Sequence, residues 1–161
     1  LNDIISDIIF DFDLLITDKN AIIHYSELPT VEAIPLQIKQ LFNNLISNAL
    51  KFSKKDVPPV VTISSQIMPH EEQMKHTKLN QEIRYFNISV KDNGMGFDQK
   101  YADQIFLIFH RLHNRNEFSG TGIGLALCKK IVVNHNGEIT GDSNGKDGAA
   151  FRILLPMTRH E

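Results

Sequence analysis

The spacing of apolar residues predicts a helix, short strands and a second helix over the first third of the chain. In "LNDIISDIIF" apolar residues recur at helical intervals, and "TDKN" at 17–20 is typical of a helix end. "AIIHY" at 21–25 and the segment around Val31 are predicted to form short strands. A second helix is expected from Pro35 to about Phe52, because proline favours the first turn and "KKDVPP" follows.

In the rest of the chain, alternating apolar residues and turn-forming residues predict strands and hairpins. "VVTISSQI" at 60–67 and "EIRYFNISVKD" at 82–92 alternate as strands, and the polar stretch 68–81 between them is expected to be a long, mobile hairpin tip. A short helix after "NGMG", a loop at about 110–121 and a helix ended by Gly137 should follow. "GEITGDS" and "AAFRILLP" predict a final hairpin turned by "NGKDG". This mixture favours an α/β (α+β) two-layer sandwich with a mixed, mostly antiparallel sheet over a doubly wound parallel sheet.

One half of the helix expected at 35–52 is unusually rich in amides. Its apolar half predicts the core, whereas the other half holds Gln37, Gln40, Asn43, Asn44, Ser47, Asn48 and Lys51. Exposed helix faces normally favour Glu, Lys and Ala, because Asn and Ser are poor helix formers. Amide oxygens suit Mg²⁺ and an ammonium suits phosphate, so two interpretations stay open: a solvated face or a ligand-facing one.

Two glycine-rich segments follow later in the chain. In "VKDNGMGFD" a strand ends at Asp92 before Gly94 and Gly96, a pattern that by itself predicts an ordinary turn. In "FSGTGIGLALCKK" alternate glycines lead into a helix, which indicates close approach of backbone to a phosphate, although no P-loop Gly-Lys-Ser/Thr follows. Between them, "IFLIFHRLHNRNEF" is expected to open and close as a lid.

The composition limits the classes of partner and the cellular compartment that can be expected. At 161 residues the chain suits one globular domain, and its net charge of −2 without basic blocks argues against nucleic-acid and direct membrane contact. Cys128 is the only cysteine, which excludes an internal disulfide and fits a reducing compartment. No signal peptide or membrane span is evident, and the missing initiator methionine suggests a piece of a longer polypeptide.

Taken in this order, the motifs resemble the catalytic and ATP-binding domain of sensor histidine kinases, in the wider group with gyrase, MutL and the ninety-kilodalton heat-shock chaperones. "NNLISNALKFS" matches the N box, "DNGMGF" and "GTGIGL" the two glycine boxes, and "IFLIFHRLH" the F box in a phytochrome-like version. The resemblance covers residues 1–157. It implies a Bergerat ATP-binding fold, with about five strands packed on about three helices, as a single domain over 1–161.

The resemblance also implies roles for particular residues. Asn44 matches the asparagine that ligates Mg²⁺, Asn48 would brace the nucleotide, and Asp92 matches the aspartate that accepts from the adenine amine. The other residues implied to contact ATP are Lys51, Gly94, Gly96, Arg111, Gly120, Thr121, Gly122, Gly124 and Leu125. Asn44, Lys51 and Arg111 are expected to act in catalysis, with Arg111 neutralising the γ-phosphate from the lid.

Two departures refine the expected function. Gln40 stands where the hydrolytic relatives place a water-activating Glu, which disfavours efficient ATP hydrolysis because an amide cannot take a proton. No histidine has the setting of the family's phosphoacceptor: His24 is expected on a surface strand, His70 in a loop, His110 and His113 in the lid and His135 at a helix end. The phosphoacceptor hairpin is therefore expected upstream of residue 1.

Two functions remain open at this point. The favoured one is a kinase domain that binds Mg-ATP and phosphorylates a histidine of a neighbouring domain, within a homodimeric parent that serves a response regulator. The alternative is an ATP-binding regulatory module without productive transfer. The isolated chain is expected to be a monomer and cytoplasmic, whether or not the parent is anchored in a membrane.

Overall fold

A five-stranded sheet organises the chain. The computed structural model describes residues 1–108 and 121–157. The strands are β1 (Ile22–Tyr25), β2 (Val60–Ile67), β3 (Tyr85–Asp92), β4 (Glu138–Asp142) and β5 (Ala150–Pro156), in the order β1-β2-β3-β5-β4. β1 runs parallel to β2 and every other neighbouring pair is antiparallel, which confirms the mixed, mostly antiparallel sheet.

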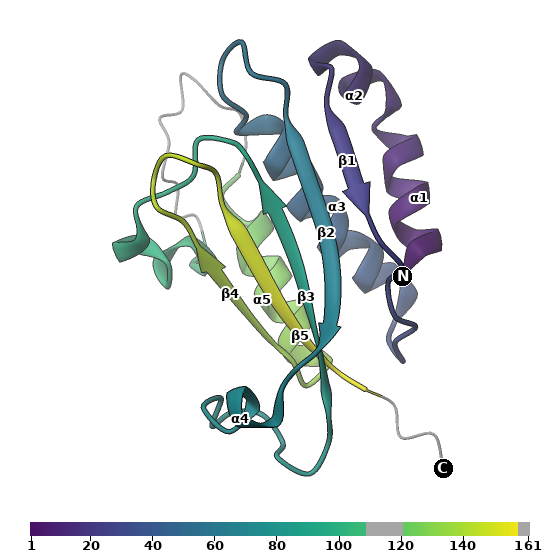
Figure 1. Ribbon diagram of the computed structural model, residues 1–161, viewed down its shortest axis with the longest axis vertical. Helices are drawn as coiled ribbons and strands as arrows, with labels where there is room; N and C mark the ends of the chain where they lie inside the picture. Colours follow the sequence, from purple (N-terminus) through teal and green to yellow (C-terminus); the bar gives the residue numbers. More distant parts are fainter. Residues whose placement is uncertain (109–120, 158–161) are drawn as a thin grey trace.

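The longer helices cover one face of this sheet, so the fold is a two-layer sandwich (Figure 1). The helices are α1 (Asn2–Asp11), α2 (Asp13–Lys19), α3 (Pro35–Lys51), α4 (His70–Gln73) and α5 (Gly124–Asn134), with 3-10 turns η1 (Gln99–Tyr101) and η2 (Gln104–Phe106). The main core lies between α1, α3, α5 and the inward residues of the strands. Among the described helices, none combines the length and the apolar character that crossing a bilayer requires.

Helix α3 follows its sequence pattern closely. Pro35 occupies its first turn, and the helix ends at Lys51, within a residue of the expected boundary. Its buried side chains all lie on one side: Ile38, Leu41, Phe42, Leu45, Ile46, Ala49 and Leu50. The core therefore fixes the rotation of α3, and the amide-rich half is turned away from the sheet.

Three local predictions are wrong. The segment around Val31 is not a strand, and the first helix is divided at Phe12 into α1 and α2. The left-handed residue after α5 is Asn136, with φ 56°, and not Gly137. Gly137 is needed for a different reason, because a Cβ there would collide with the carbonyl oxygen of Leu154.

The expected mobile tip is instead a packed substructure on the open face of the sheet. Residues 68–85 contain α4, which begins at His70, so that histidine does not lie in a loop. A second small core beneath the segment contains Met68, Leu79, Tyr85 and Leu154. These apolar residues are too widely spaced to show a helix or strand period, which is why the sequence pattern suggested mobility.

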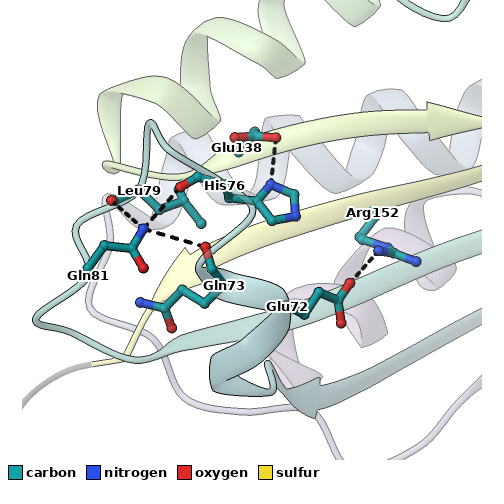
Figure 2. A network of polar contacts seen from close by, with 7 residues as sticks. All are labelled: Glu72, Gln73, His76, Leu79, Gln81, Glu138 and Arg152. Atoms are coloured by element: carbon teal, nitrogen blue, oxygen red, sulfur yellow. Dashed lines mark hydrogen bonds and ion pairs between the residues drawn. The ribbon is translucent and has the colours of Figure 1, made fainter.

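Polar contacts hold this hairpin to the sheet (Figure 2). The Arg152 guanidinium lies 2.7 Å from a Glu72 carboxylate oxygen, and His76 Nδ1 lies 3.0 Å from Glu138 Oε1. The fully buried Gln73 donates from Nε2 to the carbonyl oxygens of Asn80 and Ile83, at 3.1 and 2.7 Å. Because Glu72 of α4 reaches β5 and His76, which follows that helix, reaches β4, the tip is part of the fold.

Candidate nucleotide site

Three segments that are distant in sequence meet at one end of the molecule: the end of β3, the C-terminal half of α3 and the start of α5 (Figure 1). The backbone joins the first two directly, because the Met95 N–H donates to the Phe52 carbonyl oxygen at 3.0 Å. The third is joined through Asn44, whose Nδ2 donates to the Gly124 carbonyl oxygen at 3.5 Å. The two glycine motifs and the amide-rich helix are therefore brought together.

Asp92 occupies the end of β3 with one carboxylate oxygen already engaged. Its Oδ1 accepts from the backbone N–H groups of Gly94 (2.8 Å) and Ala149 (3.3 Å). Burial raises the pKa of this carboxyl, and the two backbone N–H groups partly counter that increase by stabilising the charge. No described residue donates to Oδ2, so this oxygen can accept a hydrogen bond from a ligand.

The glycines after Asp92 are required by the protein's own packing. A Cβ on Gly94 would lie 2.5 Å from the Phe52 carbonyl oxygen, and Gly96 has a left-handed φ of +68°. A Cβ on Gly96 would also lie 2.5 Å from Ser143 Oγ. The structure thus gives these two glycines a role that does not depend on a ligand.

Ser143 is a supporting residue that sequence reasoning missed. Its buried hydroxyl donates to the Gly148 carbonyl oxygen (2.7 Å) and accepts from the N–H groups of Phe97 (3.0 Å) and Gly145 (3.1 Å). This hydroxyl joins the first glycine motif to the β4–β5 turn. The only available signal was the turn composition of "DSNGKDG", which indicates a hairpin without indicating its partner.

The amide-rich row of α3 faces the space beside these segments. Gln40 is exposed, while Asn44, Asn48 and Lys51 are half-buried. The Lys51 ammonium lies 5.1 Å from the centre of the Phe52 ring. Within the described residues Asn44 Oδ1 has no hydrogen-bond partner, and an amide oxygen of this kind is a suitable ligand for Mg²⁺.

The second glycine motif leads into the start of α5. Gly122 is left-handed, with φ 72°, and Gly124 is the first residue of the helix. Ile123, the N-cap residue, makes no side-chain capping hydrogen bond, so the first N–H groups of α5 can bind an anion. Thr121 is exposed and Leu125 is half-buried. Arg111 and Gly120, together with most of the expected lid, including His110 and His113, lie outside the described residues.

Cys128 lies one turn further along α5, beside Asn44. Its thiol is fully buried and donates toward the Leu41 carbonyl oxygen at 3.7 Å. Burial raises the pKa of this thiol to about 12, so it stays protonated at neutral pH. This cysteine is therefore not a nucleophile.

Comparison with known proteins identifies the family and the fold. The family described as histidine kinase-, DNA gyrase B- and HSP90-like ATPase matches residues 33–159, and the chain belongs to this family. The catalytic domain of the histidine kinase ThkA, solved in a nucleotide-free form, is similar in structure, with a TM-score of 0.73 and 25% sequence identity. The superposition covers 97% of this chain and 93% of the ThkA chain. The expected fold class is thereby confirmed.

Its relatives are sensor proteins of greater length. Cyanobacterial phytochrome A of Nostoc sp. (strain PCC 7120) is 41% identical over 146 residues, which span 91% of this chain and 17% of the phytochrome. Sensor protein kinase WalK of Staphylococcus saprophyticus is 35% identical over 136 residues, spanning 81% of this chain and 20% of the kinase. The resemblance to sensor histidine kinases, including its phytochrome-like character, is confirmed. The chain corresponds to about a fifth of each of these two relatives.

Proposed function

We propose that the chain binds Mg-ATP at this site and transfers the γ-phosphoryl group to a histidine on a separate domain of the same protein. The observation that carries this proposal is the meeting of Asp92, Asn44 and the uncapped start of α5 at one end of the fold. Each offers an atom suited to a different part of the nucleotide. Asp92 Oδ2 is available to accept a hydrogen bond because the backbone engages only Oδ1, Asn44 Oδ1 can ligate a cation, and the first N–H groups of α5 can donate to anions.

The adenine end of the proposed site is Asp92. Two backbone N–H groups hold Oδ1, which fixes the carboxylate plane and leaves Oδ2 for the exocyclic amine of the base. Because Asp92 is a charged acceptor in a largely buried position, the contact is charge-assisted. Gly94 and Gly96 shape the backbone that positions it.

The phosphate end lies between α3 and α5. The start of α5, with Thr121, Gly122, Gly124 and Leu125, supplies N–H donors and the positive end of the helix dipole. Lys51 would add an ammonium and Asn48 would brace the nucleotide from α3. Arg111 and Gly120 are assigned here by resemblance only.

The residues fit a bound Mg²⁺. Asn44 would hold it together with phosphate oxygens, since magnesium prefers hard oxygen ligands and commonly uses one or two protein groups with the substrate phosphates. The bound ion would neutralise charge on the transferred phosphoryl group.

Gln40 favours transfer over hydrolysis. It is exposed one turn before Asn44, at the start of the same row. A carboxylate there could take a proton from a water molecule, whereas an amide cannot. The phosphoryl group would therefore be kept for the acceptor histidine.

Two solved structures suggest the ligand and partner classes. ShkA, with a TM-score of 0.72 and 20% identity, was solved in complex with AMPPNP. ThkA was also solved in complex with the response regulator protein TrrA. We extend both by analogy: the ligand is ATP, and the parent protein, proposed to be a homodimer, passes the phosphoryl group to a response regulator.

Phosphotransfer to an added hairpin tests the proposal. The chain is mixed with Mg-ATP and the phosphoacceptor hairpin of a related kinase, and acid-labile phosphate on the hairpin is measured. Transfer should require the hairpin histidine and should fall strongly with Asp92→Asn. Nucleotide binding without transfer to hairpins from several relatives would instead support the alternative, a regulatory ATP-binding module.

A further inference from the structure

Helices α3 and α5 together carry the candidate metal ligand and the phosphate-facing N–H groups, so their relative position matters for the site. The two helices contact each other through buried apolar side chains of the main core. Apolar contacts are non-directional, so they hold two helices together without strictly fixing where one lies along the other. Polar contacts between the helices are therefore the ones that can fix the position of α5.

Polar contacts join the two helices at both ends of α5. Near its start, Asn44 Nδ2 donates to the Gly124 carbonyl oxygen at 3.5 Å. At the other end, His135 is the C-cap residue of α5, and its Nε2 accepts from the backbone N–H of Ile34, the N-cap residue of α3, at 3.0 Å. Because α5 has 11 residues, the two contacts are about 16 Å apart along the helix.

Both ring nitrogens of His135 are engaged, which determines where the ring carries its hydrogen. Nδ1 lies 2.7 Å from the Ile131 carbonyl oxygen, which can only accept, so the hydrogen is on Nδ1. The Ile34 N–H can only donate, so Nε2 holds a lone pair. Only this neutral form makes both bonds. The other neutral form loses both, and the protonated ring loses the bond to Ile34.

We infer that His135 is a positioning residue, which holds the end of α5 against the start of α3 and so keeps the α5 N-terminus beside Asn44 for the phosphates. This inference rests on the proposed function, in which those groups bind Mg-ATP. His135 lies at the end of α5 remote from the site and acts through the two helices. Ile34 is fixed to α3, because its carbonyl oxygen accepts from the N–H groups of Gln37 and Ile38, at 3.0 and 3.1 Å.

The contact between His135 and Ile34 should respond to pH. Imidazole side chains commonly take up a proton between pH 5 and 8, and a hydrogen on Nε2 would oppose the Ile34 N–H. Within residues 1–108 and 121–157, no ion pair involves His135. The charged side chains on neighbouring elements are paired elsewhere or exposed: Lys39 with Asp11, Glu138 with His76, and the exposed Glu32, Lys129 and Lys130.

A simpler interpretation is that His135 only caps α5, since its Nδ1 bonds to a carbonyl oxygen of the last turn. Two substitutions separate the interpretations. His135→Asn places an amide nitrogen near the Nδ1 position, so it can keep the bond to Ile131 but is too short to reach Ile34. His135→Gln is one carbon longer, and its amide oxygen can accept the Ile34 N–H. Neither amide takes up a proton in this pH range.

The first measurement is calorimetric titration with Mg-ATP at pH 8 and at pH 5.5. At pH 8, His135→Gln should bind like the wild type and His135→Asn about two- to fivefold more weakly, the factor that corresponds to one neutral hydrogen bond. At pH 5.5 the wild type should weaken by about the same factor relative to His135→Gln. Comparison at a single pH removes the titration of ATP and of Asp92, which all three chains share.

The second measurement needs no nucleotide. The ring ¹⁵N resonances of His135, assigned through their loss in His135→Gln, distinguish a nitrogen that carries hydrogen from one that does not. At pH 8 the hydrogen should be on Nδ1. A hydrogen on Nε2, or one shared between the two nitrogens, would overturn the inference.

The proposed function and the inference fail in different ways. If the wild-type chain does not bind Mg-ATP, the proposed function is wrong, and with it the inference about His135. If the wild type binds, two results would each show that His135 is only a helix cap. One is that His135→Asn binds no more weakly than His135→Gln at pH 8. The other is that the wild type does not weaken relative to His135→Gln at pH 5.5.

Discussion

At the scale of single residues, Asp92 shows a conflict between stability and binding. Because burial raises its pKa above 3.8, the folded chain binds this proton more readily than the unfolded chain does. The free energy of unfolding therefore falls as pH rises above 3.8, and the deficit persists at neutral pH. The charge that would make Asp92 a good acceptor in the proposed adenine contact therefore lowers the stability of the fold.

Asp92→Asn should accordingly stabilise the nucleotide-free chain and weaken nucleotide binding. The increase in Tm over wild type should be absent at pH 3 and grow toward pH 7. Affinity for ATP and ADP should fall together, by roughly one to two orders of magnitude, because a charge-assisted hydrogen bond is worth about 1.5–3 kcal/mol. Thermal unfolding across this pH range, with calorimetry at pH 7, measures both effects.

Asp98→Asn is a control of opposite sign. The backbone N–H of Lys100 lowers the pKa of Asp98, so its contribution to stability is present above pH 3.8 and is lost as pH falls. Its replacement should slightly lower Tm at neutral pH and leave ATP affinity unchanged. A lower Tm for Asp92→Asn at pH 7 would show that burial does not dominate the titration of Asp92.

Two glycines of the site should respond differently to alanine. A Cβ on Gly94 would meet the Phe52 carbonyl oxygen at 2.5 Å, whereas a Cβ on Gly124 has no described neighbour nearer than Asn44 Oδ1, at 3.8 Å. Gly94→Ala should thus lower the free energy of unfolding by about 1–3 kcal/mol. Gly124→Ala should leave stability unchanged or higher, yet weaken ATP binding by about tenfold or more, because its Cβ would enter space kept for phosphate.

Urea unfolding and calorimetry on the two alanine variants separate a glycine needed by the fold from one needed by the ligand. Wild-type ATP affinity in Gly124→Ala would show that backbone does not approach a phosphate at this position.

At the scale of elements, predictability follows the length and regularity of the apolar pattern. The predicted bounds of α3 and β2 agree closely with the structure, because each element is long and carries an uninterrupted helical or alternating period. α4 was missed because four polar residues carry no period, and its packing depends on Tyr85 and Leu154 from strands that lie elsewhere in sequence. The division at Phe12 was missed because the helical pattern continues across it.

The hairpin at 68–85 provides a prediction at the same scale. Gln73→Met removes two buried hydrogen bonds and leaves the carbonyl oxygens of Asn80 and Ile83 without that donor, so it should cost about 1–3 kcal/mol. Arg152→Ala breaks a pair that is 50% exposed at the arginine and should cost less than about 1 kcal/mol. Denaturant unfolding gives both values.

ATP affinity should stay at the wild-type value in both hairpin variants. The hairpin adjoins Tyr85, at the start of β3, whereas Asp92 ends that strand, so the two lie at opposite ends of the fold (Figure 1). Weaker ATP binding by Gln73→Met would indicate that the hairpin and the site are coupled.

At the scale of the whole molecule, the order of motifs predicted the family, while the contacts that join the motifs could not be foreseen. The Asn44–Gly124 bond joins residues 80 apart, and the Phe97–Ser143 bond joins residues 46 apart. Such pairings depend on strand order and register, which local periodicity does not determine. The candidate ligands could thus be named from the sequence, whereas the supporting role of Ser143 required the fold.

The arrangement of the whole molecule also predicts that the chain alone does not phosphorylate itself. Of its described histidines, His70 and His76 lie in the hairpin at the end opposite to the site, and His24 lies on the edge strand β1. His135 lies at the far end of α5, with its ring nitrogens 2.7 Å from the Ile131 carbonyl oxygen and 3.0 Å from the Ile34 N–H. Incubation with Mg-ATP should therefore give no acid-labile phosphate on the chain.

Phosphate release should also be slow, because Gln40 cannot activate water. Mass spectrometry at neutral pH and a steady-state phosphate assay test both points; rapid release would favour an ATPase, and phosphate on His110 or His113 would identify an acceptor within the chain.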